Sequence, residues 1–343
     1  MSNLSKVTVS VVVPLYNEVE NVGILVDRIT ESLTNSKHAF EILLVNDGSQ
    51  DGTFLAMQAQ RDEKGEHIKL IDLSRNYGQT AAMQAGIDYA EGSIIVTMDG
   101  DLQNDPSDIP KLIDELLSRD LDLVQGWRMN RKDGLVLRKI PSKIANWLIG
   151  KITGLKLHDY GCSLKVYRAE MIKQVRLYGE MHRFIPVWAT SVTSPDRIGE
   201  IPVKHHSRQF GESKYGISRT FRVILDLISV FFFQRYRARP SHFFGIIGLV
   251  FGTLGGIILA YLFSIRLVLG VDIGDRPLLI GGVLLVMISM QFITTGVIAE
   301  MLSRIYFSQD AQGSYYVSKR SSELGAFKHA NQEPKTVTGD DHA

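Results

Sequence analysis

The sequence predicts an α/β domain followed by a pair of membrane-spanning helices. From about residue 8 to residue 203, short Val-, Ile- and Leu-rich runs alternate with segments of helical periodicity. This pattern is typical of parallel strands that are covered by helices on both faces. Further along, the formal charges between His242 and Ala299 cluster in one break between two long apolar runs, and they are Arg266, Asp272, Asp275 and Arg276.

Five short apolar runs are expected to form the strands of the α/β domain, over residues 9–15, 41–45, 68–73, 93–98 and 121–126. The first four runs end in polar or glycine-bearing residues. In α/β folds the ligand-binding residues follow the carboxyl ends of the strands. We therefore expect a functional site where these runs end, within a cytosolic domain that covers residues 1–215.

Two apolar runs, residues 243–265 and 278–299, are 23 and 22 residues long. At 1.5 Å per residue each helix would be about 33 Å long, enough to cross a hydrocarbon core of about 30 Å. Between Ile201 and Pro240 there are eight Lys and Arg residues against two acidic residues. The positive-inside rule then places both termini in the cytoplasm of a multi-pass inner-membrane protein, with the hairpin within residues 241–305.

Two basic amphipathic segments accompany the hairpin, and they cover residues 135–155 and 216–240. The first either packs one face on the sheet or lies at the membrane surface, whereas the second is expected at the membrane surface because a span follows directly. Gly248, Gly252 and Gly256 recur every four residues, a spacing that permits self-association as a dimer or tetramer. The cytosolic segment 306–343 is expected to be disordered from about residue 331.

Composition excludes several classes of protein. The chain has 343 residues, 38 basic against 37 acidic groups, and the single cysteine Cys162. One cysteine rules out an intrachain disulfide and a Cys-rich zinc site, and fits a reducing compartment. The phosphate-binding glycine signatures of P-loop nucleotidases and dinucleotide oxidoreductases are missing, and we expect no nucleic-acid partner.

Acidic side chains follow the predicted strands. Asp99 and Asp101 flank Gly100, so both carboxylates can reach one hard cation, with Gln103 as a third ligand. Mg²⁺ and Mn²⁺ favour such oxygen ligands and are often held by one or two carboxylates together with substrate phosphates. A lone Asp-x-Asp is usually a solvated turn, but here the first two strands also end in carboxylates, at Glu18 and Asp47.

The order of these strand-end motifs carries a family resemblance. The motifs are Pro14-Leu15-Tyr16-Asn17-Glu18, Asn46-Asp47-Gly48-Ser49 and Asp99-Gly100-Asp101-Leu102-Gln103, followed by Pro106. Together they resemble family 2 glycosyltransferases of the GT-A fold. The polyisoprenyl-phosphate glycosyltransferases are most similar, among them dolichyl-phosphate mannose synthases and the bactoprenol glucosyltransferases with two C-terminal membrane helices. The resemblance implies a nucleotide-sugar donor, a divalent metal and a polyprenyl phosphate acceptor.

The resemblance also implies roles for particular residues. Catalytic roles fall on Asp101 and Asp159, and the metal ligands are Asp99, Asp101 and Gln103. The acceptor phosphate would contact Arg128, Arg138 and Ser142. The nucleotide sugar would contact Pro14, Tyr16, Glu18, Asp47, Asn76, Asp99, Arg208 and Lys214. Gln79 stands where relatives often have a basic residue, which leaves the donor open.

Simpler interpretations of several residues stay open. Glu18 is also placed to cap the helix that follows it, and Asp47 to form an ordinary turn. Asp159 fits a solvated loop residue as well, and Arg128, Arg138 and Lys214 fit surface positive charges near a membrane.

We expect inverting transfer of a hexose to undecaprenyl phosphate, with UDP-glucose as donor and GDP-mannose or another UDP-sugar as the alternatives. A phosphate monoester has a second pKa of about 6, so the acceptor is mostly a dianion at neutral pH and needs little deprotonation. Asp159 is then expected mainly to position the acceptor or to balance charge, with the role of a base left open.

Two other functions are weighed against this one. Enzymes that glycosylate a hydroxyl group, such as processive polysaccharide synthases, carry a Gln-x-x-Arg-Trp motif that Gln234-Arg235-Tyr236-Arg237 does not match. A non-catalytic scaffold or flippase subunit would not need the intact Asp99, Asp101 and Gln103.

Overall fold

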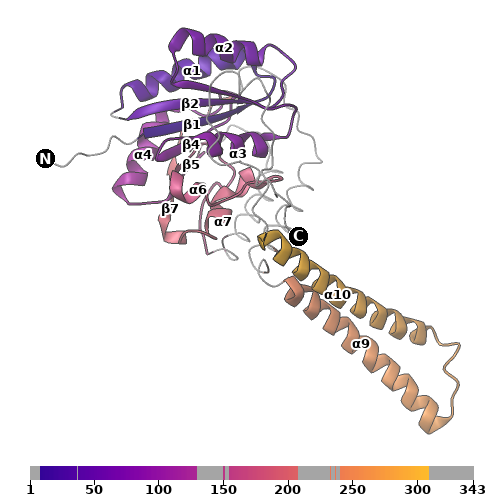
Figure 1. The fold of residues 1–343 in the computed structure, drawn as a ribbon. Coiled ribbons are helices and arrows are strands. Elements are labelled where there is room, and N and C mark those ends of the chain that lie inside the picture. The colour runs from indigo at the N-terminus through magenta and orange to yellow at the C-terminus, as the bar shows by residue number, and fades with distance from the viewer. Residues whose placement is uncertain are drawn as a thin grey trace, which may run out of the picture. The chain divides into compact units, whose positions relative to one another are not determined.

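The computed structural model describes residues 8–36, 38–129, 150, 154–207, 232, 236 and 240–308. These residues fall into two compact units, one within Met1–Lys214 and the other within Tyr215–Gly313. The first contains the sheet and the second contains two long helices (Figure 1).

A seven-stranded sheet forms the first unit, in the order β3-β2-β1-β4-β6-β5-β7. The strands are β1 (Thr8–Leu15), β2 (Ala39–Asn46), β3 (Ile68–Asp72), β4 (Ile94–Thr97), β5 (Leu123–Trp127), β6 (Lys165–Arg168) and β7 (Ile198–Pro202). All pairs are parallel except those that β6 makes with β4 and β5. The predicted α/β class with a mostly parallel sheet is confirmed, although β6 and β7 were not among the predicted strands.

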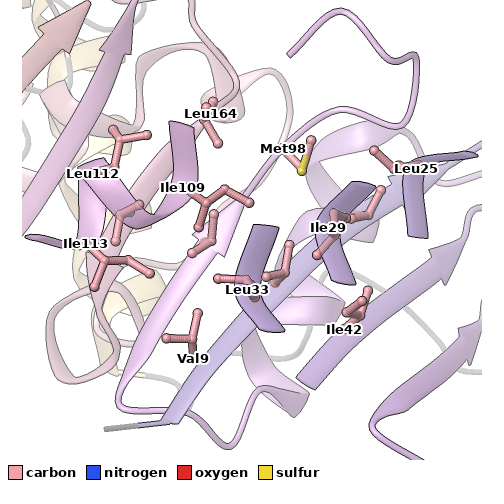
Figure 2. Close-up of a cluster of buried hydrophobic side chains, with 14 of the residues drawn as sticks. Val9, Leu25, Ile29, Leu33, Ile42, Met98, Ile109, Leu112, Ile113 and Leu164 are labelled. Carbon is pink, nitrogen blue, oxygen red and sulfur yellow. The ribbon is translucent and has the colours of Figure 1, made fainter. Parts of the chain in front are cut away.

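Helices cover both faces of the sheet. They are α1 (Val19–Thr34), α2 (Thr53–Lys64), α3 (Gln79–Tyr89), α4 (Ile109–Ser118), α6 (Ala169–Ile172) and α7 (Ile185–Ala189), with 3₁₀ turns η1 (Pro106–Asp108), η2 (Met181–Phe184) and η3 (Pro195–Arg197). Figure 2 shows Leu25, Ile29 and Leu33 of α1 in one cluster with Ile109 and Leu112 of α4. Successive strand residues point to opposite faces, so the neighbours of this cluster in β1 are Val9, Val11 and Val13.

Helix α3 packs on the opposite face, and a glycine permits the close approach. A Cβ added to Gly86 would lie 2.2 Å from Cγ1 of Val12 and 3.2 Å from Cγ2 of Val45. Any larger residue there would push α3 away from the sheet. Because Gln79 is the first residue of α3, this packing also places the start of the helix at the carboxyl edge of the sheet.

The amino edge of the sheet holds a buried ion-pair network. Glu41 accepts a hydrogen bond from the hydroxyl of Ser10 and one from the backbone N–H of Glu91 at 2.8 Å, and Lys69 Nζ lies 2.7 Å from it. Burial alone would raise the pKa of Glu41, but the bonds from Lys69, Ser10 and Glu91 outweigh burial and lower the pKa. Lys69 Nζ also lies 3.0 Å from Glu91. The protein itself therefore supplies the groups that keep Glu41 ionised.

Two long apolar helices, α9 (Pro240–Leu269) and α10 (Pro277–Ser308), form the second unit. Both are long and apolar enough to cross a membrane, and they contain the predicted spans 243–265 and 278–299. Their outward side chains, such as Leu249, Ile257 and Met290, are more than half exposed. Surfaces of this kind are stable in contact with lipid.

The repeated glycines bring the two helices of the hairpin together. A Cβ on Gly248 would lie 2.8 Å from Cγ1 of Ile293, and one on Gly252 would lie 2.6 Å from Oγ of Ser289. Gly256 has no neighbour within 4 Å of its added Cβ among the described residues. Two of the three predicted small residues are thus used inside the hairpin, and self-association stays a prediction.

Candidate active site

The predicted site residues gather at the carboxyl edge of the sheet. The described ones lie at the ends of β1 to β5 or just before β6, and they are Pro14, Tyr16, Glu18, Asp47, Asn76, Asp99, Asp101, Gln103, Arg128 and Asp159. Because β6 runs antiparallel, its amino end reaches the same edge as the carboxyl ends of the others. Arg138, Ser142, Arg208 and Lys214 lie outside the described residues, as do most of segments 135–155 and 216–240.

Asp47 fixes the loop that follows β3. Its carboxylate accepts hydrogen bonds from the backbone N–H groups of Tyr77 at 2.7 Å and Gly78 at 2.9 Å. Burial raises the pKa of Asp47, against the effect of these two bonds. Only 3% of the residue is exposed. Asp47 therefore anchors this loop, and its predicted contact with base or ribose stays a prediction.

Gly48 allows the loop after β2 to contact the loop after β3. Gly48 has φ +66°, and a Cβ added there would lie 2.3 Å from the carbonyl carbon of Arg75. Only glycine combines this left-handed backbone with so close an approach. The exposed Asn76 is thereby held above the end of β2.

The loop between β1 and α1 is tied to the loop after β2. Asn17 has φ +55° and accepts from the backbone N–H of Gln50 at 3.0 Å, and its own N–H donates to Ser49 Oγ at 2.9 Å. Helix α1 begins at Val19, but the Glu18 side chain makes no capping bond. It accepts instead from the amide of Asn21. The capping interpretation of Glu18 is therefore wrong.

Asp99 and Asp101 follow β4 in a tight loop against the end of β1. A Cβ added to Gly100 would lie 2.4 Å from Cδ2 of Leu15 and 3.3 Å from the carbonyl oxygen of Pro14. Gln79 Nε2 donates to Asp99 Oδ1 at 2.6 Å, and the backbone N–H of Gln103 donates to Asp101 Oδ1 at 3.2 Å. Two strands and the start of α3 thus set the positions of both carboxylates.

The charges in this loop fit a divalent cation. Burial, and then the negative charge of Asp101, raise the pKa of Asp99, against the effects of Ser163, Lys165 and Arg128. A cation would relieve this repulsion. Within the described ranges no group of three or more His, Cys, Asp or Glu side chains could hold a metal ion. Asp99 and Asp101 are two carboxylates, and Mg²⁺ is often held by one or two carboxylates together with substrate phosphates.

Arg128 and Asp159, predicted to have separate roles, form one ion pair. Arg128 Nε lies 2.7 Å from Asp159 Oδ2 and Nη2 lies 3.0 Å from Oδ1. The backbone N–H of Gly161 also donates to Oδ1, at 3.2 Å. Burial alone would lower the pKa of Arg128, but the Asp159 carboxylate outweighs burial and raises it. Neither residue is the isolated surface charge that the simpler interpretation proposed.

Lys165 lies beneath this edge and was not predicted from the sequence. In the sheet register it pairs with Thr97 of β4 and with Gln125 of β5, so it lies between the strands that carry Asp99 and Arg128. It is 1% exposed, and burial lowers its pKa to about 8. Lys165 Nζ donates to the carbonyl oxygen of Cys162, so this lysine supports the segment before β6.

Gln79, Ser163 and Gln125 were missed as well. Ser163 hydrogen bonds to Asp99 and its Oγ accepts from Asn104 Nδ2 at 2.7 Å, while Gln125 Nε2 donates to the carbonyl oxygen of Asp159. The sequence offered a reason to examine Gln79, because this residue departs from the family pattern. The roles of Ser163 and Gln125 depend on the position of the antiparallel strand β6, which the sequence pattern did not predict.

The segment after β7 reaches the loop that carries Asp99, Asp101 and Gln103. Asn104 and His205 form an isolated β-bridge, and the backbone N–H of His206 donates to the carbonyl oxygen of Gln103 at 2.8 Å. The His206 ring lies 3.0 Å from Asp105. The chain that leads into the predicted basic loop therefore leaves from beside Gln103.

Comparison with known proteins reveals extensive similarity. The sequence profile of Glycosyl transferase family 2 matches residues 10–176. A dodecaprenyl-phosphate galacturonate synthase of Rhizobium johnstonii is 58% identical over 308 residues, which is 90% of this chain and 91% of that protein. An undecaprenyl-phosphate 4-deoxy-4-formamido-L-arabinose transferase of Yersinia pestis is 36% identical over 91% of this chain and 93% of that one.

Solved structures resemble the chain in fold. Glucosyl-3-phosphoglycerate synthase of Mycobacterium tuberculosis, in complex with Mn²⁺, UDP and phosphoglyceric acid, matches with a TM-score of 0.54 and 15% identity. The match covers 66% of this chain and 78% of that chain. At this identity the likeness concerns the fold alone, and it confirms the predicted GT-A fold.

Proposed function

The chain belongs to glycosyl transferase family 2, among the enzymes that transfer a sugar to a polyprenyl phosphate, and from this premise we propose that its donor is UDP-galacturonic acid. The observation that carries the proposal is the 58% identity to a dodecaprenyl-phosphate galacturonate synthase over 90% of the chain. The glucose expected from the sequence has less support, because the relatives are named for galacturonate and for 4-deoxy-4-formamido-L-arabinose.

In the proposed reaction an oxygen of the lipid phosphate attacks the anomeric carbon of the donor sugar with inversion. The bond between that carbon and the diphosphate breaks, and UDP leaves with the electron pair. Negative charge therefore builds up on the leaving diphosphate, next to the carboxyl edge of the sheet. Stabilisation of developing charge by fixed groups is commonly the largest catalytic contribution in such a site.

Asp99, Asp101 and Gln103 would hold Mg²⁺ or Mn²⁺, which when bound supplies a Lewis acid that neutralises charge on the diphosphate. The glucosyl-3-phosphoglycerate synthase that shares the fold was solved with Mn²⁺ and UDP. We assign Pro14, Tyr16, Glu18 and Asn76 to nucleotide binding. Arg208 and Lys214 are assigned to the diphosphate, because the segment that leads to them starts beside Gln103.

Acceptor binding is assigned to Arg128, with Arg138 and Ser142. Arg128 lies at the end of β5, the same sheet edge as the aspartates that follow β4. A guanidinium group suits a phosphate dianion because its planar N–H groups can donate two parallel hydrogen bonds. Asp101 remains the catalytic carboxylate of the proposal, through the cation that it holds.

The hairpin explains how the enzyme meets its acceptor. A polyprenyl chain cannot leave the bilayer, so a catalytic domain that uses it has to work at the membrane surface. The two helices are long and apolar enough to cross a membrane, and we assign them the role of the membrane anchor. We propose that it is an inner-membrane protein with both termini in the cytoplasm, where nucleotide sugars are made.

A donor panel tests the proposal. Membranes that contain the full chain are incubated with undecaprenyl or dodecaprenyl phosphate, Mn²⁺ or Mg²⁺, and radiolabelled UDP-galacturonic acid, UDP-glucose or GDP-mannose. Label from UDP-galacturonic acid should enter the organic phase and should remain in the aqueous phase with Asp101→Asn. Transfer from UDP-glucose alone would overturn the donor assignment, and no transfer from any donor would favour a non-catalytic scaffold.

A further inference from the structure

We propose that Asp159 is a positioning residue that acts through Arg128, and that the segment 159–163 links the acceptor half of the site to the metal-binding half. The inference rests on the proposed lipid-phosphate acceptor. It assigns Asp159 no proton transfer: the carboxylate orients the guanidinium group, and the guanidinium group receives the phosphate. The starting observation is that the two residues form one buried pair instead of facing the substrate separately.

The pair is too well fixed for Asp159 to act as a base. Both carboxylate oxygens accept from the guanidinium group, and Gly161 adds a backbone donor. The side chains of Arg128 and Asp159 are 16% and 10% exposed. Removing one partner from a buried pair leaves an uncompensated charge in the protein. A carboxylate that left Arg128 to collect a proton would create this situation.

The charged surroundings of Asp159 point the same way. Besides Arg128, Lys165 of β6 and Cys162 of its own segment interact electrostatically with Asp159. Arg128 and Lys165 are cations, and nearby positive charge favours the ionised form of a carboxylate. A base has little to do at the acceptor, because a phosphate monoester is mostly a dianion at neutral pH and has already lost its proton.

The geometry leaves part of Arg128 for a phosphate. A guanidinium group has five N–H donors, and Arg128 uses Nε and Nη2 on Asp159. Its remaining three N–H groups have no acceptor within the part of the chain that the structure describes. Asp159 therefore holds the Nε and Nη2 edge of the group and leaves Nη1 on the side away from the carboxylate. Without Asp159 the charge would remain, but its orientation would not.

The other end of the same segment holds the metal-binding loop. Ser163 hydrogen bonds to Asp99, and its Oγ accepts from Asn104. Between these ends, the carbonyl oxygens of Asp159 and Cys162 accept from Gln125 and Lys165. A five-residue segment anchored to the sheet therefore sets the distance between the acceptor arginine and the cation ligands.

A control pair exists on the same strand. Asp122 precedes β5 and forms a bidentate pair with Arg197, with Nε at 2.7 Å from Oδ2 and Nη2 at 2.9 Å from Oδ1. It lies at the amino edge, away from the site. Asp122→Asn also removes one partner of a bidentate Asp–Arg pair, although Asp122 contacts Thr193 and Arg168 as well. It shows whether the loss of such a pair away from the site changes either KM.

The test is steady-state kinetics of the full chain in detergent, with the donor and the lipid phosphate varied separately. For Asp159→Asn we expect the KM for the lipid to rise about 10-fold, the size of one lost charge-assisted hydrogen bond, with kcat changed less than about 3-fold. The shape of the pH profile should not change, and Asp159→Glu should recover part of the KM. Asp122→Asn should leave both KM values unchanged.

A contrasting variant probes the other end of the segment. Ser163→Ala should raise the metal concentration needed for half-maximal activity and the donor KM more than the lipid KM. The proposal is overturned if Asp159→Asn lowers kcat at saturating lipid by about 10² or more and abolishes the acidic limb of the pH profile, as loss of a general base would. Failure of the wild-type chain to transfer any sugar would instead reject the proposed function.

Discussion

The two edges of the sheet differ in how the charges of their buried carboxylates are balanced. At the amino edge, bonds from Lys69, Ser10 and Glu91 outweigh burial and lower the pKa of Glu41, and Arg197 does the same for Asp122. At the carboxyl edge, burial raises the pKa of Asp47, and burial together with Asp101 raises the pKa of Asp99. The amino edge neutralises these charges with its own side chains, and the carboxyl edge does so at Asp159 through Arg128. Asp99 differs, because burial and the neighbouring Asp101 leave its pKa raised.

This difference separates residues kept for stability from residues kept for function. A functional site commonly retains arrangements that are unfavourable in the unliganded protein. Substitutions at the amino edge should therefore cost stability with little effect on the activity of the folded protein. Substitutions of Asp99 or Asp101 at the carboxyl edge should cost activity with little effect on the stability of the ligand-free protein.

The largest effect is expected for Asp101→Asn. Losing an electrostatic group of this type lowers kcat by about 10²–10³. The ligand-free variant should melt no lower than wild type, because one of two neighbouring negative charges is removed while Asn can still accept from Gln103. Parallel transfer assays and melting curves in chelator check both parts. A large loss of stability without ligand would contradict the distinction between the edges.

Glu41→Gln tests the opposite edge. We expect a loss of about 2 kcal/mol in the free energy of unfolding at neutral pH, since hydrogen bonds to charged groups contribute about 1.5–3 kcal/mol. Activity per folded molecule should match wild type. The folded-state pKa of Glu41 lies below its ordinary value of 4.5, so its contribution is complete above that value and is lost as the pH falls through the lower, folded-state pKa. The free energies of unfolding of wild type and Glu41→Gln should therefore become equal at acid pH. A difference that stays constant with pH would contradict the role given to the Glu41 charge.

A smaller effect is expected for Gln79→Ala, which removes the amide that donates to Asp99 Oδ1 at 2.6 Å. Loss of one hydrogen bond of about 1 kcal/mol should raise the metal requirement about fivefold and leave the lipid KM unchanged. Titration of activity with Mn²⁺ at fixed substrates measures this. Equal changes in both constants would indicate a general disturbance of the edge.

The sequence predicted which residues lie at the carboxyl edge better than it predicted which of them pair with each other. Apolar runs that end in Glu18, Asp47 and Asp99 predicted a parallel sheet with acidic residues at one edge, because side chains at the ends of adjacent parallel strands must meet. The pairing of Arg128 with Asp159 could not be predicted. It depends on β6, a strand of only four residues that inserts antiparallel between β4 and β5.

The amino edge was not predicted at all as a site of interaction. Glu41 appeared only as the first residue of an apolar run, and its partners Ser10 and Lys69 lie on two other strands. Such contacts depend on register between strands, which periodicity does not reveal. The sequence pattern does not define the donor sugar either, since the residues expected to hold a cation do not distinguish glucose from galacturonic acid.

The most direct test compares ligand-induced stabilisation of three proteins in detergent: wild type, Asp101→Asn and Glu41→Gln. Melting temperatures are measured in chelator and again with Mn²⁺ and UDP. A ligand at 100 times its Kd stabilises the folded state by about 2.7 kcal/mol. The melting temperatures of wild type and Glu41→Gln should rise equally on addition of Mn²⁺ and UDP, although the two proteins melt at different temperatures in chelator. The melting temperature of Asp101→Asn should not rise. An equal gain in Asp101→Asn would show that the carboxyl edge does not hold the cation and would contradict the account.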